Sequence, residues 1–359
     1  MIVTYPQKKT YTFVFILIIG ILVFLSYRFL KNQEPTENPL LSPQKILVAI
    51  TQIAPHPSLD AIRKGIVDVL KENDIPENGI LFQNAQGNVS TAAQISQKFV
   101  SLSPKVIVPI TTPSSQSAYA VAKPRNIPVV FVAVSDPVAA KLSSNLEKGS
   151  EGMTGVYDEA PIQEQANLIK EILSFKDHPL TIGILYNPGE ANSVSMIEKM
   201  SEALKKLNIN IIKVAASATT EVSTAAKSLV NKVDAIYIPN DNTLISALDA
   251  VLKVSQEHKI PVFSSDPESV EKGCLATLAP NQYEIGRQAG KLVVSVLKGT
   301  IVEKIPLEKA LILTLVLNQE TARHLGITFP EHILIKADKI INASIETEKT
   351  SLKSGAENE

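Results

Sequence analysis

Short apolar runs alternate along the chain with longer segments whose apolar residues recur at helical spacing. The first run, 45–50, precedes a segment from Leu59 to Glu72 whose apolar residues share one helical face, and Ser58 can cap this helix. Runs of this kind predict buried strands, and their alternation with helices predicts parallel sheets covered on both faces. The further predicted strands are 80–82, 106–110, 127–134, 181–186, 210–214, 234–238, 260–263, 273–278 and 311–317. The further predicted helices are 89–102, one ending at 121, 161–173, 193–207, 220–231, 243–256 and 281–297.

Two strand ends repeat with the same chemistry. Residues 127–137 end in Ser-Asp-Pro, and residues 260–267 end in Ser-Asp-Pro again. The preceding strands also correspond, since Val108-Pro109 and Ile238-Pro239 lie at the same spacing of roughly 130 residues, the size of a domain. This duplication predicts two like halves that face each other.

The amino-terminal region has a different pattern. Tyr11 to Leu30 is nearly all apolar, and about 20 such residues match the length of a helix that crosses a membrane. The segment is longer than the apolar part of a usual secretory signal and no small-x-small cleavage site follows it, so we favour an uncleaved anchor over a cleaved signal. Residues 32–43 contain three prolines and predict a linker, whereas the polar tail 346–359 predicts disorder.

Composition narrows the function classes. A chain of 359 residues with 45% hydrophobic residues has room for about two domains. The net charge of −1 and the lack of a Lys/Arg cluster argue against nucleic acid as a partner. The single cysteine, Cys274, excludes an internal disulfide, and the scattered histidines show no metal-ligand spacing. Neither a dinucleotide fingerprint nor a phosphate-binding loop is present, so we expect no cofactor.

Ligands of open parallel sheets bind beyond the carboxyl ends of the strands, and these ends carry polar residues without Lys or Arg. Carboxylates without basic side chains suit a ligand with an ammonium group, while helix N-termini near Ser58 and Thr112 suit its carboxylate. The pattern therefore predicts a zwitterionic amino acid, with Tyr157 and Tyr186 near its side chain. The strand-end residues are His56, Ser58, Thr111, Thr112, Ser114, Ser115, Ser135, Asp136, Asn187, Glu190, Asn192, Asn240, Asp241, Asn242, Ser265 and Asp266.

Most of these residues also have a purely structural interpretation. Asp241 can cap the helix that follows it, and the same holds for Thr112 and Ser114. Asp136 and Asp266 precede prolines, where a turn alone explains an aspartate. Asn187 and Asn192 can serve the turn at Pro188-Gly189, and we expect Glu190 to be solvated.

Several stretches, in matching order over about residues 44 to 340, resemble the tryptophan/tyrosine-type substrate-binding proteins of ABC transporters. They are Ile-Ala-Pro-His-Pro-Ser-Leu-Asp-Ala-Ile (53–62), Asn-Ala-Gln-Gly-Asn (84–88), Thr-Thr-Pro-Ser-Ser-Gln-Ser-Ala (111–118), Val-Ser-Asp-Pro-Val (134–138), Thr-Gly-Val-Tyr-Asp (154–158), Pro-Asn-Asp-Asn-Thr (239–243) and Gln-Tyr-Glu-Ile-Gly-Arg-Gln-Ala-Gly (282–290). The resemblance implies a type I periplasmic-binding-protein fold, an α/β fold of two Rossmann-like lobes with parallel sheets, here preceded by one N-terminal transmembrane helix.

The sequence pattern, which gives the anchor, linker and tail, and the resemblance, which implies the two lobes, together divide the chain. Residues 1–31 form the membrane anchor or signal segment, 32–43 the linker, 44–157 and 281–308 lobe 1, 158–280 and 309–345 lobe 2, and 346–359 the disordered tail. The residues that the family pattern places in the cleft are Ser58, Thr112, Ser114, Asp136, Asp158, Asn187, Asn192, Asp241, Asn242 and Asp266.

Our first hypothesis is an extracytoplasmic protein that captures a small amino-acid-like ligand, aromatic ones included, and delivers it to an ABC permease. It would sit at the cell membrane, anchored by its N-terminal helix, with the binding domain on the periplasmic side. The chain departs from such proteins in having no lipid-attachment cysteine near its anchor. A membrane-anchored sensor of solutes is therefore the alternative, and an enzyme using Asp241 and Asp266 is the third hypothesis.

Overall fold

The computed structural model describes Met1 and residues 24–28, 46–147 and 149–342. Met1–Gln44 and Lys45–Glu359 are separate compact units. The predicted anchor lies outside the described residues except for 24–28, which are helical, and the predicted tail lies outside them altogether. Among the helices that the structure describes, none has the length and apolar character needed to cross a membrane. The architecture below is that of the second unit.

A first sheet of six strands has the order β11-β5-β4-β3-β1-β2, and all its pairings are parallel. Every residue of β1, β3 and β4 is buried, because helices cover both faces of the sheet. This burial explains why these strands read as unbroken apolar runs. The strands are β1 Val48–Gln52, β2 Ile80–Asn84, β3 Val106–Ile110, β4 Val129–Val132, β5 Met153–Tyr157 and β11 Glu308–Lys309.

A second sheet of seven strands has the order β13-β12-β10-β9-β8-β6-β7. The prediction of purely parallel sheets is wrong at one place, since β12 pairs with β10 in the antiparallel sense. The chain enters β12 directly from the first sheet after β11, without a crossover helix, so it runs opposite to its neighbour. The strands are β6 Thr181–Tyr186, β7 Asn210–Ala215, β8 Ala235–Ile238, β9 Val262–Ser264, β10 Ala276–Pro280, β12 Leu313–Asn318 and β13 Lys339–Ile341.

Helices complete two lobes, which we define by their sheets. Lobe 1 has α2 Pro57–Glu72, α3 Val89–Leu102, α4 Thr112–Ala122 and α11 Gln282–Leu297. Lobe 2 has α5 Ile162–Ile172, α6 Ala191–Lys206, α7 Val222–Ser228, α8 Asn242–Ser246, α9 Leu248–His258, α10 Pro267–Lys272, α12 Gln319–Leu325 and α13 Glu331–Lys336. The single helix predicted over 243–256 is two helices, because Ala247 leaves the helical conformation between α8 and α9. The α/β fold with two largely parallel sheets is as predicted.

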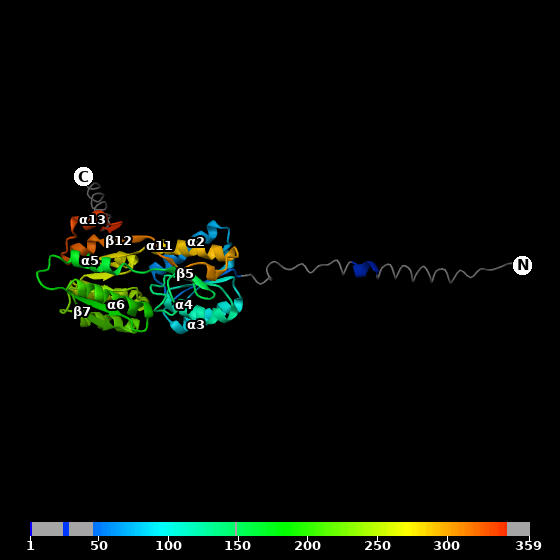
Figure 1. Ribbon diagram of the computed structural model, residues 1–359, viewed down its shortest axis with the longest axis horizontal. Coiled ribbons are helices and arrows are strands. Elements are labelled where there is room, and N and C mark those ends of the chain that lie inside the picture. Colours follow the sequence, from blue (N-terminus) through cyan, green and yellow to red (C-terminus); the bar gives the residue numbers. More distant parts are fainter. Residues whose placement is uncertain (2–23, 29–45, 148, 343–359) are drawn as a thin grey trace, which may run out of the picture. The chain divides into compact units, whose positions relative to one another are not determined.

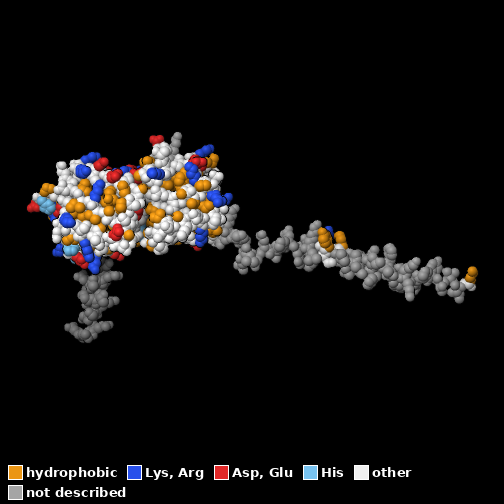
Figure 2. All heavy atoms as spheres, turned by 90° about the horizontal axis from the view of Figure 1, so that it is seen from below, with side chains coloured by type: hydrophobic (Ala, Val, Ile, Leu, Met, Phe, Trp, Pro, Cys, Tyr) orange, Lys and Arg blue, Asp and Glu red, His pale blue; other side chains and the backbone are white. Residues whose placement is uncertain are grey.

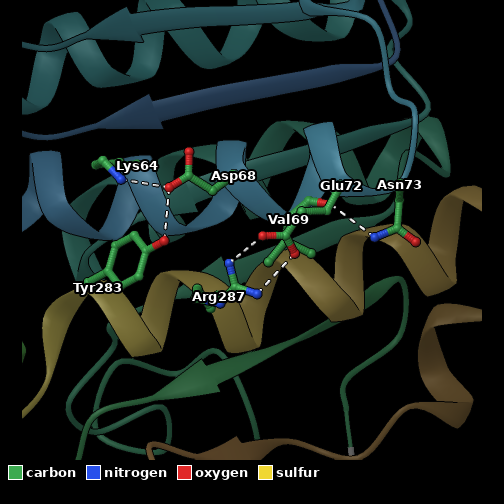
Figure 3. A network of polar contacts seen from close by, with 7 residues as sticks. All are labelled: Lys64, Asp68, Val69, Glu72, Asn73, Tyr283 and Arg287. Carbon is green, nitrogen blue, oxygen red and sulfur yellow. Dashed lines mark hydrogen bonds and ion pairs between the residues drawn. The ribbon is translucent and has the colours of Figure 1, made fainter.

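Helix α11 lies beside α2, although the two are far apart in the sequence (Figure 1). Glycines permit this approach: a Cβ on Gly286 would lie 2.0 Å from the carbonyl oxygen of Ile62, and one on Gly65 would lie 2.2 Å from that of Tyr283. The outer side of the contact carries polar pairs (Figure 3), including a two-pronged bond from Arg287 to Glu72 at 2.8 and 2.9 Å. The helix pair therefore fixes the N-termini of α2 and α11, both of which reach the candidate site.

The chain passes between the lobes after β5, after β10 and after β11. Basic and acidic side chains are interspersed on the face of the molecule shown in Figure 2. The surface of that face therefore offers no broad field of one sign to a partner.

Candidate functional site

A cavity lies between the lobes at the carboxyl ends of the strands, with about 420 Å³ of space including the part open to solvent. Both lobes line it, lobe 1 through the loops after β1, β3, β4 and β5 and lobe 2 through the loops after β6, β8 and β9. The lining residues are His56, Ser58, Leu59, Thr111, Thr112, Ala133, Ser135, Asp158, Asn192, Asn240, Asp241, Asn242, Ile245, Asp266 and Gln282.

Two neighbouring strand ends in lobe 1 have backbone conformations that L residues rarely adopt. Thr111, after β3, has φ 78° and ψ 163°, and Ala133, after β4, has φ 54°. Such conformations cost about 1–3 kcal/mol each. Both residues line the cavity, and the Thr111 hydroxyl oxygen is buried without a hydrogen-bond partner. The strain therefore serves to shape this wall.

Asp158 is the carboxylate best placed to meet a ligand. Its side chain is 3% exposed, and its Oδ2 accepts a hydrogen bond from Asn240 Nδ2 at 3.1 Å across the lobes. Its Oδ1 is buried with no partner. Burial raises the pKa of Asp158 to about 7, and hydrogen bonds from Ser135 and Asn240 offset this only in part. A cationic group of a ligand would supply the missing partner.

His56 and Ser58, at the start of α2, form the floor on the lobe 1 side. The Ser58 hydroxyl donates a hydrogen bond to Asp266 of lobe 2, and the His56 Nδ1 is buried without a partner. Burial lowers the pKa of His56, although Asp266 acts in the opposite sense, so the imidazole is neutral at pH 7. Burial and Asp266 raise the pKa of the adjacent Glu268 to about 8.

Asp241 lines the cavity, but its own lobe satisfies its carboxylate. It caps α8 by accepting from Leu244 N–H at 2.9 Å, and it also accepts from Asn187 N–H and the Ser193 hydroxyl, both at 2.6 Å. Burial and then the nearby Glu190 raise the pKa of Asp241 to about 7. The cap bond from Leu244 and the two further bonds from lobe 2 occupy both oxygens of Asp241, so among the aspartates that line the cavity Asp158 is the one with a buried oxygen that has no partner.

The expectation that Glu190 is solvated is wrong. Its side chain is only 7% exposed, and it accepts bonds from the backbone and side chain of Asn242 and of Thr243, at distances of 2.6 to 3.1 Å. It binds the free N–H groups at the start of α8, where a carboxylate is favoured. Glu190 is therefore part of the wall behind Asn242 and is not solvated.

The structure brings seven of the ten predicted site residues to the cavity: Ser58, Thr112, Asp158, Asn192, Asp241, Asn242 and Asp266. Ser114 and Asn187 do not line the cavity. Ser114 is fully buried, and Asn187 Nδ2 donates a hydrogen bond to Thr243 Oγ1 at 2.8 Å. Asp136 lies outside the cavity, where it contacts helix α6 of the other lobe. Tyr157 and Tyr186, expected near the ligand side chain, do not line the cavity either.

Four lining residues were expected neither from the strand ends nor from the resemblance: Leu59, Ala133, Ile245 and Gln282. Gln282 comes from α11, which returns to lobe 1 after the second sheet, so no local pattern marks it. Among the described residues that line the cavity, none is Lys or Arg, and three are aspartates. The site is therefore acidic and suits a ligand with a positive charge.

Comparison with known proteins gives consistent matches. A family model described as ABC transporter substrate binding protein matches residues 47–341. The "Tyrosine-binding protein" of Clostridioides difficile (strain R20291) is 35% identical over 281 residues, which is 77% of this chain and 80% of that protein.

Two solved structures are similar to this chain over most of its length. The domain from Streptococcus pneumonia in complex with L-Trp is 34% identical, covers 83% of this chain and 100% of its own, and has a TM-score of 0.79. The ligand-free, open structure of a substrate binding protein with adhesive properties from Clostridium difficile is 33% identical at 83% and 100% coverage, with a TM-score of 0.62. At nearly equal identity and coverage, the chain is therefore more similar in structure to the L-Trp complex than to the open structure.

Proposed function

The chain belongs to the ABC transporter substrate-binding protein family, and from this premise we propose that it captures an amino acid between its lobes and delivers it to an ABC permease. The observation that carries the ligand class is the buried, unpartnered Oδ1 of Asp158 in an acidic cavity. This family is not a class of enzymes, and no finding favours the sensing alternative.

The ammonium group of the amino acid binds Asp158. A buried carboxylate oxygen without a partner costs about 1–3 kcal/mol or more, and a charge-assisted bond from an ammonium group removes this cost. Asn240 binds Oδ2, so Oδ1 is the oxygen that remains for the ligand. Asn192, whose buried Oδ1 also has no partner, is a second acceptor for the same group.

The carboxylate of the amino acid binds at the N-terminus of α4. The first N–H groups of a helix have no intrahelical partner, and the positive end of the helix dipole attracts an anion. Thr112 begins α4, Thr111 precedes it, and the Thr111 hydroxyl has no partner. Backbone N–H groups can thus bind the carboxylate without any Lys or Arg.

We propose that the side chain of the amino acid is aromatic. Two of the relatives are named as binding tyrosine or holding L-Trp. In this chain the neutral imidazole of His56 and the apolar Leu59 and Ile245 line the same cavity. They offer one flat and two aliphatic surfaces for a ring.

Calorimetry on the purified full chain tests the proposal. We expect L-Tyr or L-Trp to bind, tryptamine to lose the carboxylate contacts, and indole-3-propionate to lose the contact with Asp158. Ligand at a hundred times its Kd should also add about 2.7 kcal/mol to the free energy of unfolding. Equal binding of L-Trp and indole-3-propionate would contradict the role of Asp158, and no response to any amino acid would contradict the ligand class.

The membrane attachment is a separate proposal. We propose that Tyr11 to Leu30 anchors the chain with the binding domain on the extracytoplasmic side, because this apolar segment has the length of a membrane helix. The full chain should stay in the membrane fraction after alkaline extraction, and protease added to spheroplasts should degrade its binding domain. A mature protein that begins beyond residue 30 would instead indicate a cleaved signal.

A further inference from the structure

We propose that Asp136 is a positioning residue, a latch that holds the two lobes closed without touching the ligand. The inference rests on the proposed function in one respect, because the latch would stabilise the lobes when they close around a solute. It also gives a role to an aspartate that the sequence placed in the cleft and that the structure places outside it.

The loop after β4 fixes Asp136 firmly to lobe 1. Its Oδ1 accepts a bond from Ala139 N–H at 2.9 Å, and its backbone carbonyl accepts one from Ala140 N–H at 3.0 Å. Gln116 of α4 binds the carbonyl of Ala140 at 3.0 Å and so ties this turn to the helix. These bonds occupy one carboxylate oxygen and leave Oδ2 facing lobe 2.

Helix α6 of lobe 2 supplies two donors to that oxygen. The Ser195 hydroxyl lies 2.6 Å and the Lys199 ammonium 3.1 Å from Asp136 Oδ2. The two residues are four apart and share one face of α6, so they meet the same acceptor. Partial burial acts to raise the pKa of Asp136, but the bonds from Ala139, Ser195 and Lys199 together hold it below its ordinary value. The carboxylate is thus charged at neutral pH.

The position of this contact separates it from ligand binding. Asp136, Ser195 and Lys199 do not line the cavity. Among the ion pairs of the described residues, Asp136 with Lys199 is the one that joins lobe 1 to lobe 2. The Ser58 to Asp266 and Asp158 to Asn240 bonds also cross between the lobes, but all four residues line the cavity and can contact a ligand.

A contact formed only when the lobes meet changes the equilibrium between open and closed forms. Its loss lowers the closed fraction, and the apparent affinity for every solute falls by the same factor. A half-exposed ion pair and one hydroxyl bond to a charged group together account for about a 3- to 10-fold effect. We expect this effect in the dissociation rate, because the latch must break before a solute leaves.

The test compares Asp136→Asn and Lys199→Met with Lys205→Met, which removes an exposed charge from the end of the same helix. Asparagine keeps an acceptor for Ala139 N–H, so the turn is preserved. L-Tyr and L-Trp should both bind 3- to 10-fold more weakly to the first two variants, in an unchanged ratio, and normally to the control. The double variant should lose no more than the larger single loss. A changed ratio between the two ligands would mean that Asp136 contacts them, and unchanged affinities would overturn the latch.

A distance measurement keeps the latch testable if neither amino acid binds. Spin labels at Lys98→Cys in α3 and Lys227→Cys in α7 report the lobe separation, and the native Cys274 is fully buried. Without any amino acid added, Asp136→Asn should shift the population toward the longer distance. An unchanged distribution would overturn the latch, whereas failure of wild type to bind either amino acid would overturn only the proposed ligand.

Discussion

Replacing Asp158 by Asn should weaken amino acid binding and reduce its dependence on pH. At pH 8 the wild-type carboxylate is ionised and can make a charge-assisted bond to the ammonium group. Such bonds contribute about 1.5–3 kcal/mol, so the variant should bind about 10- to 150-fold more weakly. The amide keeps the shape of the side chain, which limits the change to the charge.

The pH profile follows from the position of this carboxyl. Burial raises the pKa of Asp158 to about 7 when no cation faces it, while a bound ammonium group lowers it. Binding therefore releases a proton below pH 7, and the affinity falls as the pH falls. One pH unit below the pKa only about a tenth of the molecules are ionised, so Kd should be about tenfold higher at pH 6 than at pH 8. Burial lowers the pKa of His56, which favours its neutral form over the protonated one.

Calorimetry at pH 6, 7 and 8, in buffers of different ionisation enthalpy, measures both the affinity and the number of protons released. Wild type should release about half a proton from Asp158 at pH 7 and almost none at pH 8, and Asp158→Asn should lack this contribution at pH 7. A wild-type Kd that is constant from pH 6 to 8 would refute the reasoning. So would an Asn variant that keeps the wild-type slope.

Three further substitutions test the scaffold of the site. Gly286→Ala places a Cβ 2.0 Å from the carbonyl oxygen of Ile62, so it should lower the free energy of unfolding by about 1–3 kcal/mol in urea titrations, whereas Lys291→Ala on the exposed side of α11 should not. Asp241→Asn puts an amide against donors such as Asn187 N–H, so it should lower the melting temperature while L-Trp affinity at pH 8 changes little; a large loss of affinity with normal stability would make Asp241 a ligand contact. Thr111→Gly relieves a backbone at φ 78° and should raise stability by about 1 kcal/mol while weakening L-Trp binding, and a loss of stability would show that the conformation is not strained.

The sequence predicted the edge of the sheets where the cavity lies, because parallel strands gather their carboxyl ends at one edge. The repeated strands β3 and β8 and their following loops supply Thr111, Thr112, Asn240 and Asp241, all of which line the cavity. The division of roles within this set could not be predicted. Whether Asp241 or Asp158 has a free oxygen depends on which donors surround each carboxylate, and these come from distant segments such as the α6 helix.

The contacts between the lobes could not be predicted from the sequence for a related reason. Asp136 and Asp266 occupy corresponding Ser-Asp-Pro turns, yet Asp266 lines the cavity and Asp136 meets α6 outside it. Each aspartate accepts a bond from the backbone N–H three residues further on, although a helix follows only Asp266, and the opposite lobe presents different partners to the two side chains. The antiparallel direction of β12 could not be predicted either, because an apolar run does not show in which direction its strand pairs with a neighbour.

The pairing of α2 with α11 has a consequence for how the chain is made. Glu72 and Arg287, which join the two helices, are 215 residues apart, so at about 5–20 residues per second α2 waits roughly 10–40 s for its partner to be synthesised. During that interval the groove around Gly65 is uncovered and the first lobe cannot complete its core. In nascent chains stalled before residue 282, the first lobe should therefore be sensitive to protease. A holdase chaperone that binds apolar helices would bind the uncovered face of α2 in these chains.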